Sequence, residues 1–218
     1  MTEITISMLK QLRELTGVGM NTCKEALVAS NGDIEEAVTY LRKKGLSSAA
    51  KKADRVTNEG MIGTAETSAA VALVEVNAET DFVVKNDRFQ EFLRNVAEEA
   101  AQTSPASLDN FLSQKYSKDS GMTIDEYRAT VIQAIGENIQ IRRLQILPKS
   151  SDKSIGVYTH LGGKLVVTVE LGGTNGEEGL AKEIAMHIAA ASPDYVSADK
   201  IPSEILEHEK EIIRSQIP

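Results

Sequence analysis

Four adjacent residues, Thr80–Val83, place a carboxylate beside an aromatic ring in the sequence Thr-Asp-Phe-Val. They follow the strand-like run Val71–Asn77 and precede a helix-like pattern. Neither the carboxylate nor the ring has an evident covalent reaction to perform at such a position. Both groups are instead suited to entering another protein from the end of a strand. These four residues, the tip, therefore predict a contact element and not a catalytic centre.

The same four residues allow a purely structural interpretation. Asp81 can cap the helix that begins nearby, and Phe82 can pack into the core as a hydrophobic staple. The local pattern taken alone favours this structural interpretation, so both interpretations stay open.

Other chemically active residues lack the spacing that catalysis or metal binding needs. The sequence contains no GxxxxGK[ST] phosphate loop and no GxSxG nucleophile elbow. His160, His187 and His208 are too far apart in the sequence to form a compact metal-binding pattern. Cys23 is the only cysteine, which excludes an intramolecular disulfide, and its place on a helix seam is typical of a small core residue. We therefore expect no enzyme activity, no bound metal and no cofactor.

The charge and hydropathy patterns restrict the class of partner. The net charge is −8, whereas proteins that bind a phosphate backbone carry excess Lys and Arg. One basic cluster exists, but it is equally compatible with a solvated linker: Lys43, Lys44, Lys51, Lys52 and Arg55. No apolar run approaches the ~18 residues of a membrane span, and the first residues lack the features of a secretion signal. These patterns predict a cytoplasmic protein that binds neither nucleic acid nor membrane.

Residues 1–45 have the periodicity of three short amphipathic helices. Gly17 and Gly19 separate the first two, and Asn31-Gly32 ends the second, after which Asp33 can cap the third. Helices this short are unstable alone, so we expect a compact bundle closed by Gly45. The turn at residues 16–20 is either a tight connection or an exposed apolar site. Residues 46–58, rich in Ser, Ala, Lys and Asp, are predicted to form a charged linker that can be partly helical.

From Gly60 onward, the pattern changes to strands and longer helices. Strand-like runs precede an amphipathic helix near Phe89, a second helix is expected at residues 125–135, and another strand follows at residues 139–146. The pair Arg142-Arg143 interrupts the alternation of that strand and indicates a β-bulge.

The second half of the chain repeats the first at a shift of 95 residues, which places Ile62 on Val157 and Val76 on Leu171. Each copy has the pattern of a hairpin followed by a helix. The positions that match the tip are Asn175-Gly-Glu-Glu178, so the tip is an addition to the shared scaffold. The sequence thus predicts an α+β fold with a first core subdomain at residues 59–150 and a related second subdomain at residues 151–218.

Six motifs in this order resemble the bacterial translation elongation factor Ts family. They are Leu12–Met20, Cys23–Leu27, Asn31–Asp33, Asn77–Val83, Ile135–Ile139 and Ala185–Ala189. The resemblance runs almost end to end, and it implies a head like a ubiquitin-associated (UBA) domain before a core of two related strand-and-helix subdomains. It also implies a guanine nucleotide exchange factor for elongation factor Tu, which performs no covalent chemistry.

The resemblance assigns roles to particular residues. The tip, comprising Thr80, Asp81, Phe82 and Val83, would enter beside the partner's GDP and help dislodge its magnesium ion. Met186 and His187 on a core helix would help hold the partner's G domain. The head would grip that domain through Arg13, Thr16, Gly17, Val18, Gly19, Met20, Cys23 and Lys24.

Two further expectations accompany this interpretation. The alternative function is a passive adaptor whose UBA-like head binds a partner without promoting exchange, although the absence of the tip from the second copy favours an exchange factor. Long family members continue past Ile217-Pro218, so we expect a C-terminally short form whose incomplete second subdomain ends in an acidic helix. Apolar surface left uncovered there would favour a homodimer.

Overall fold

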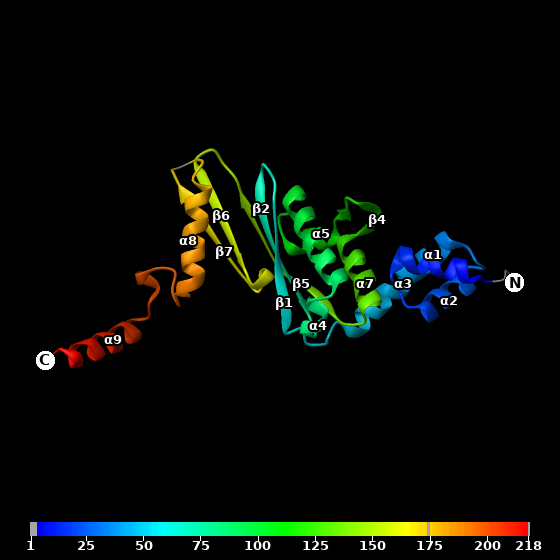
Figure 1. Ribbon diagram of the computed structural model, residues 1–218, viewed down its shortest axis with the longest axis horizontal. Coiled ribbons are helices and arrows are strands. Elements are labelled where there is room, and N and C mark those ends of the chain that lie inside the picture. Colours follow the sequence, from blue (N-terminus) through cyan, green and yellow to red (C-terminus); the bar gives the residue numbers. More distant parts are fainter. Residues whose placement is uncertain (1–3, 174, 218) are drawn as a thin grey trace.

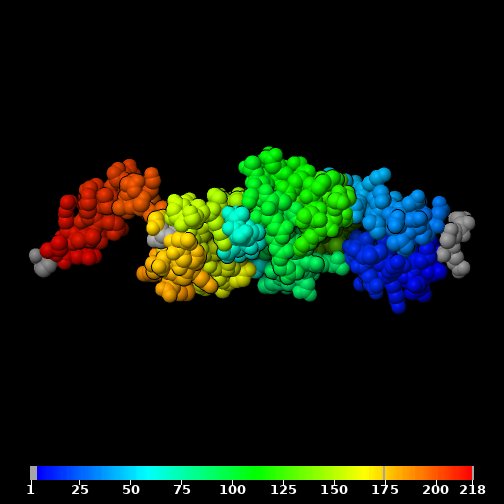
Figure 2. All heavy atoms as spheres, turned by 90° about the horizontal axis from the view of Figure 1, so that it is seen from above, coloured from blue at the N-terminus to red at the C-terminus, as the bar shows by residue number. Residues whose placement is uncertain are grey.

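The computed structural model describes residues 4–173 and 175–217. Its parts lie in a row, with a helical head at one end, an α+β core in the middle and a C-terminal helix at the other end (Figure 1). Figure 2 shows the same order from above. The predicted α+β class is confirmed.

The head consists of α1 (Ile6–Thr16), α2 (Met20–Ala29) and α3 (Ile34–Lys52). Their apolar stripes meet in a small core of their own, formed by Leu12, Val18, Cys23, Ala26, Leu27, Ala37 and Leu41. Asp33 caps α3 as predicted, since its carboxylate accepts a hydrogen bond from the Glu36 amide at 2.8 Å.

Helix α3 does not stop at Gly45, as the sequence had indicated, but continues to Lys52. The first half of the predicted linker is therefore helical. A Cβ atom at position 45 would lie 3.3 Å from the Ala129 carbonyl oxygen, so Gly45 is a point of close approach between α3 and α7 (Ile124–Ile135). The extra turns bury Ala49 against the core, and this packing outweighs the low helix propensity of glycine.

The first part of the core is a three-stranded antiparallel sheet in the order β1-β2-β5. Its strands are β1 (Glu59–Glu66), β2 (Ala70–Ala78) and β5 (Ile139–Pro148). Glu75 pairs with Arg143 while Val76 pairs with Ile141, which leaves Arg142 as an extra residue in β5. The predicted bulge is confirmed.

Helices cover one side of this sheet (Figure 1). Phe89, Phe92 and Val96, all on α5, are buried beneath it. The covering elements are α4 (Asp81–Val84), α5 (Asp87–Thr103), α6 (Leu108–Ser113), the short hairpin β3 (Lys115–Tyr116) and β4 (Asp119–Thr123), and α7. The sequence patterns indicated α5 and α7 but missed the hairpin, whose strands are too short to show a period.

A second hairpin lies on the other side of the sheet, with α8 (Glu178–Ala191) packed against it (Figure 1). Its strands, β6 (Lys153–His160) and β7 (Leu165–Gly172), are joined by the 3-10 turn η1 (Leu161–Gly163) and recur near the 95-residue shift from β1 and β2. Beyond η2 (Ala198–Lys200), α9 (Ser203–Gln216) projects from the end of the chain and has no buried residue. Its exposed Ile205, Leu206 and Ile213 are compatible with the expected homodimer, which stays a prediction.

Candidate partner-binding site

Three of the four tip residues lie in the single helical turn α4, which follows β2 after Glu79 and Thr80. Thr80 has extended backbone angles (φ −129°, ψ 156°), and its hydroxyl oxygen accepts a hydrogen bond from the Val83 amide at 3.4 Å. Thr80 is therefore the N-cap of this turn. The expectation that Asp81 caps the helix was wrong, because Asp81 is already the first helical residue.

Phe82 points into solvent, with 81% of its surface exposed. The structural interpretation of Phe82 as a core staple is therefore wrong. The adjacent Val83 and Val84 fill the core instead, at 9% and 1% exposure. Successive residues of a helix point about 100° apart, so burying both valines turns Phe82 outward. A large aromatic ring is normally stabilised by burial, and this one is not buried within the chain. Exposed apolar side chains of this size are typical of a contact surface.

Asp81 lies beside Phe82 and forms an ion pair with Lys85 at 2.8 Å. The hydrogen bond from the Lys85 ammonium lowers the pKa of Asp81, so the carboxylate is ionised at neutral pH. Both side chains are largely exposed, and an ion pair of this kind contributes little to stability. The tip thus presents an aromatic ring and a negative charge together.

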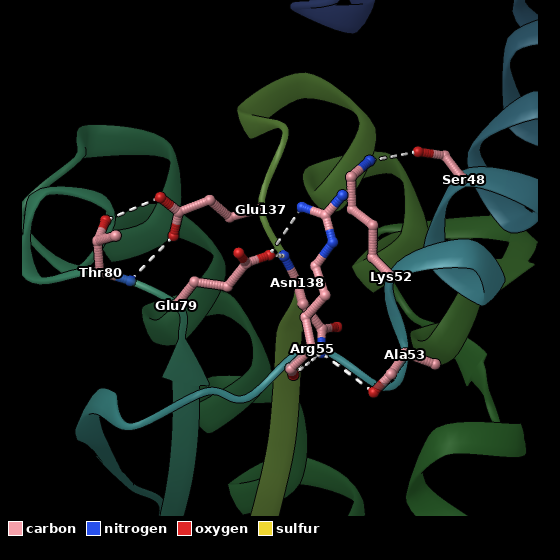
Figure 3. Close-up of polar contacts among 8 residues, drawn as sticks. All are labelled: Ser48, Lys52, Ala53, Arg55, Glu79, Thr80, Glu137 and Asn138. Carbon is pink, nitrogen blue, oxygen red and sulfur yellow. Dashed lines mark hydrogen bonds and ion pairs between the residues drawn. The ribbon is translucent and has the colours of Figure 1, made fainter.

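The tip rests on the turn between α7 and β5 (Figure 3). Glu137 accepts hydrogen bonds from both the amide and the hydroxyl of Thr80, at 3.0 and 2.8 Å. Asn138 donates its backbone N–H to Glu79 at 2.6 Å. Sequence reasoning included both turn residues in a family motif but gave them no role, since nothing in the pattern brings position 137 next to position 80.

The turn between α1 and α2, residues 16–20, is the second candidate surface. Met20 is 37% exposed, and Arg13, Gly19 and Lys24 are also exposed. Gly17 adopts φ +68°, a conformation that favours glycine, and it ends α1. Thr16 holds the turn, because its hydroxyl donates to the Leu12 carbonyl at 2.7 Å.

Two of the predicted head contacts, Val18 and Cys23, are inside the bundle at 3% and 0% exposure. The Cys23 thiol donates to the Val18 carbonyl at 3.4 Å. Their side chains are therefore not placed to touch a partner, and they instead hold the turn that carries the exposed residues. The expectation that Cys23 is a small core residue is confirmed.

Burial raises the pKa of the Cys23 thiol, and the reactive thiolate is therefore scarce at neutral pH. We expect a maleimide or disulfide reagent to modify the folded chain more than about tenfold more slowly than the unfolded chain. Because Cys23 is the only cysteine, the labelling rate reports the opening of the head alone. Equal rates with and without denaturant would contradict the buried position.

The head turn contacts α5, the helix that follows the tip, through Arg88. Its guanidinium lies so close to Gly17 that a Cβ atom there would fall 1.5 Å from one of its nitrogens. A second link joins Arg42 of α3 to Asp119 of β4 at 2.7 Å. A cavity of about 290 Å³ remains between head and core, lined in part by Val38 and Tyr127. The head is thus fixed relative to the element that follows the tip.

The third predicted surface lies on α8, where Met186 is 48% exposed and His187 is also exposed. The opposite face of α8 buries Ala181 and Ala185. The head lies on the opposite side of the β1-β2-β5 sheet from α8 (Figure 1). The structure therefore does not gather the predicted residues into one patch but distributes them over separate surfaces of an elongated protein.

Within residues 4–173 and 175–217, no group of three or more His, Cys, Asp or Glu side chains could hold a metal ion. No helix in this part of the chain is long and apolar enough to cross a membrane.

The helical head, the α+β core and the exposed tip define the class of protein: an α+β factor with a UBA-like head. Residues 7–45 match the model of a UBA-like domain. Residues 79–218 match the model of the family described as Elongation factor TS. The chain belongs to the elongation factor Ts family, which makes it a translation elongation factor.

Individual relatives agree with the family assignment. The chain is 61% identical to Elongation factor Ts of Protochlamydia amoebophila (strain UWE25) over 217 residues, which cover 100% of this chain and 77% of that relative. It is 45% identical to Elongation factor Ts of Chlamydia caviae and 43% identical to that of Chlamydia pneumoniae, with the same coverage of each chain.

Proposed function

We propose that this chain binds GDP-bound elongation factor Tu and promotes GDP release, after which GTP can bind. The tip enters beside the partner's nucleotide and helps dislodge the magnesium ion. The observation that carries this proposal is the exposure of Phe82 on a turn whose neighbouring residues are firmly packed. Membership of the elongation factor Ts family supports elongation factor Tu as the partner.

The free energy for exchange comes from burial of the Phe82 ring in the partner. Complete burial of such a side chain contributes about 1.5–3 kcal/mol. If the receiving pocket exists only when the partner's nucleotide loops are displaced, this contact shifts the partner toward the displaced state. By linkage, GDP then weakens binding of the chain by the same factor as the chain weakens binding of GDP.

Asp81 acts through its charge. An ionised carboxylate brought next to the partner's magnesium site disturbs the water and side chains around the ion, without becoming a ligand itself. The chain makes and breaks no covalent bond in this scheme, so it is an exchange factor and not an enzyme. It needs no cofactor of its own and acts in the cytoplasm, without nucleic acid or membrane.

The head supplies the hold on the partner. In this proposal, its exposed residues Arg13, Gly19, Met20 and Lys24 contact the G domain, while Val18 and Cys23 maintain the turn. Met186 and His187 add a contact from α8. Nucleotide-free elongation factor Tu is then held until GTP arrives.

Release of a fluorescent GDP from elongation factor Tu tests the proposal. We expect substoichiometric chain to accelerate release, because each molecule can act on many partners in turn. Binding without faster release would instead support the passive adaptor, in which the UBA-like head recognises a partner and the tip has no effect. Absence of both binding and acceleration would remove elongation factor Tu as the partner.

A further inference from the structure

Glu137 holds the base of the tip with both of its carboxylate oxygens. Oε2 accepts the backbone N–H of Thr80 at 3.0 Å, and Oε1 accepts the Thr80 hydroxyl proton at 2.8 Å. Hydrogen bonds to an ionised acceptor are about twice as strong as those between neutral groups. The same Thr80 hydroxyl accepts the Val83 amide, so Glu137 fixes the group that starts the helical turn.

These bonds continue the sheet beyond its last paired residues. Ala78 of β2 pairs with Ile139 of β5, and beyond this last pair Asn138 is hydrogen-bonded to Glu79 and Thr80 to Glu137. At these positions, side-chain carboxylates replace the carbonyl acceptors of a regular ladder. The backbone N–H groups of Thr80 and Asn138 are therefore hydrogen-bonded where the sheet ends, and the tip does not start from a frayed strand end.

The same turn also holds the linker that comes from the head. The Asn138 side-chain amide donates to the Arg55 carbonyl at 2.9 Å and to the Ala53 carbonyl at 3.3 Å. Arg55 in turn forms an ion pair with Glu79 at 3.4 Å. Figure 3 shows the linker and the base of the tip meeting at this turn. The position of the tip is thus set relative to the path of the chain that leads from the head.

From this geometry, we propose that Glu137 is a positioning residue for nucleotide exchange, an inference that rests on the proposed function. A four-residue helix has no stability of its own, because forming its first turn costs more than its hydrogen bonds return. An unsupported tip would have to become ordered when it enters the partner, and that cost would reduce the effect of Phe82. Glu137 removes the cost by ordering the turn in advance.

Glu137 acts through Thr80 and not on the partner itself. Its side chain is half-buried, and both of its oxygens already accept hydrogen bonds from the tip. Loss of Glu137 should therefore lower the maximal release rate, which depends on the tip. The chain concentration that gives half the maximal rate should change little, because it depends mainly on how tightly the head binds the partner.

The experiment measures fluorescent GDP release from elongation factor Tu over a range of chain concentrations. We expect Glu137→Ala to lower the maximal rate roughly tenfold, and Glu137→Gln to lower it less, since its one amide oxygen keeps one of the two bonds. Thr80→Ser keeps the hydroxyl that Glu137 accepts, so its maximal rate should exceed that of Thr80→Val, which lacks the hydroxyl. Amide hydrogen exchange at Thr80 should rise in Glu137→Ala, which reports the loosened turn directly.

A double-mutant cycle distinguishes positioning from direct contact. If Glu137 acts through Thr80, the combination of Thr80→Val with Glu137→Ala slows release less than the product of the two single effects. If the two reductions in maximal rate multiply and the half-maximal chain concentration rises, Glu137 touches the partner directly. That result would overturn the inference. An unchanged maximal rate in Glu137→Ala would also overturn it.

Two controls keep the outcome decisive. Glu66→Gln makes the same chemical change at the far end of the same sheet, where Glu66 pairs with Lys149, and should leave release unchanged. Thermal unfolding detects a variant that fails to fold. In that case, the comparison of Thr80→Val with Thr80→Ser still tests the contact, because equal maximal rates in these two variants would overturn it. Failure of the unmodified chain to accelerate release would instead count against the proposed function.

Discussion

Phe82→Ala is expected to lower the maximal rate of GDP release from elongation factor Tu by about tenfold to a hundredfold. The range follows from the ~1.5–3 kcal/mol that burial of the ring provides, at about 1.4 kcal/mol for each factor of ten. The half-maximal chain concentration should rise far less, because the contacts of the head remain. The measurement is release of a fluorescent GDP over a range of chain concentrations.

The substitution should leave the fold intact, which makes the kinetic result easy to interpret. The ring is 81% exposed, so its removal creates no cavity, and the melting temperature should not fall. Tyr40→Ala is a matched control, because it removes another exposed aromatic ring from α3, outside the proposed contacts. A maximal rate for Phe82→Ala equal to that of the unmodified chain would refute the role of the tip.

Local patterns were enough to predict the head and much of the sheet. The apolar stripes of three helices, the Asp33 cap and the Arg142 bulge all depend on neighbours within a few residues along the chain. Such short-range signals hold wherever no long-range contact overrides them. The one failure in the head, the end of α3, has a long-range cause, since Gly45 serves the contact with α7.

The same limit explains why the orientation of the tip could not be predicted. A four-residue turn is too short to show helical periodicity, so the sequence could not tell which of its side chains faces the core. The orientation of the tip is set by Glu137, which lies 57 residues from Thr80 in the sequence, and by the burial of Val83 and Val84. The contact of Arg88 with Gly17 has no local signal either, since it joins separate domains.

The head should be the part of the chain most sensitive to a single core substitution. Its core is small, and Leu27 is completely buried in it. Leu27→Ala is expected to cost about 2–5 kcal/mol, through lost burial and the cavity left behind. A bundle of this size has little stability in reserve, so a large fraction of the heads should open.

Faster Cys23 labelling would report that opening, while the core should keep its own unfolding transition. Val28→Ala is the matched control, since Val28 is the next residue of α2 and is 56% exposed. Val28→Ala should change neither the rate of Cys23 labelling nor the rate of GDP release from elongation factor Tu.

The kinetic effect of Leu27→Ala should be the converse of that of Phe82→Ala. Opening of the head weakens binding of elongation factor Tu, so the half-maximal chain concentration should rise at least about tenfold, in inverse proportion to the fraction of heads that stay folded. The tip remains intact on the core, and partner-bound chains have a folded head. The maximal release rate should therefore approach that of the unmodified chain once the concentration is high enough. A lowered maximal rate at saturation would mean that the head, through Arg88 and the linker, helps to position the tip as well as to hold the partner.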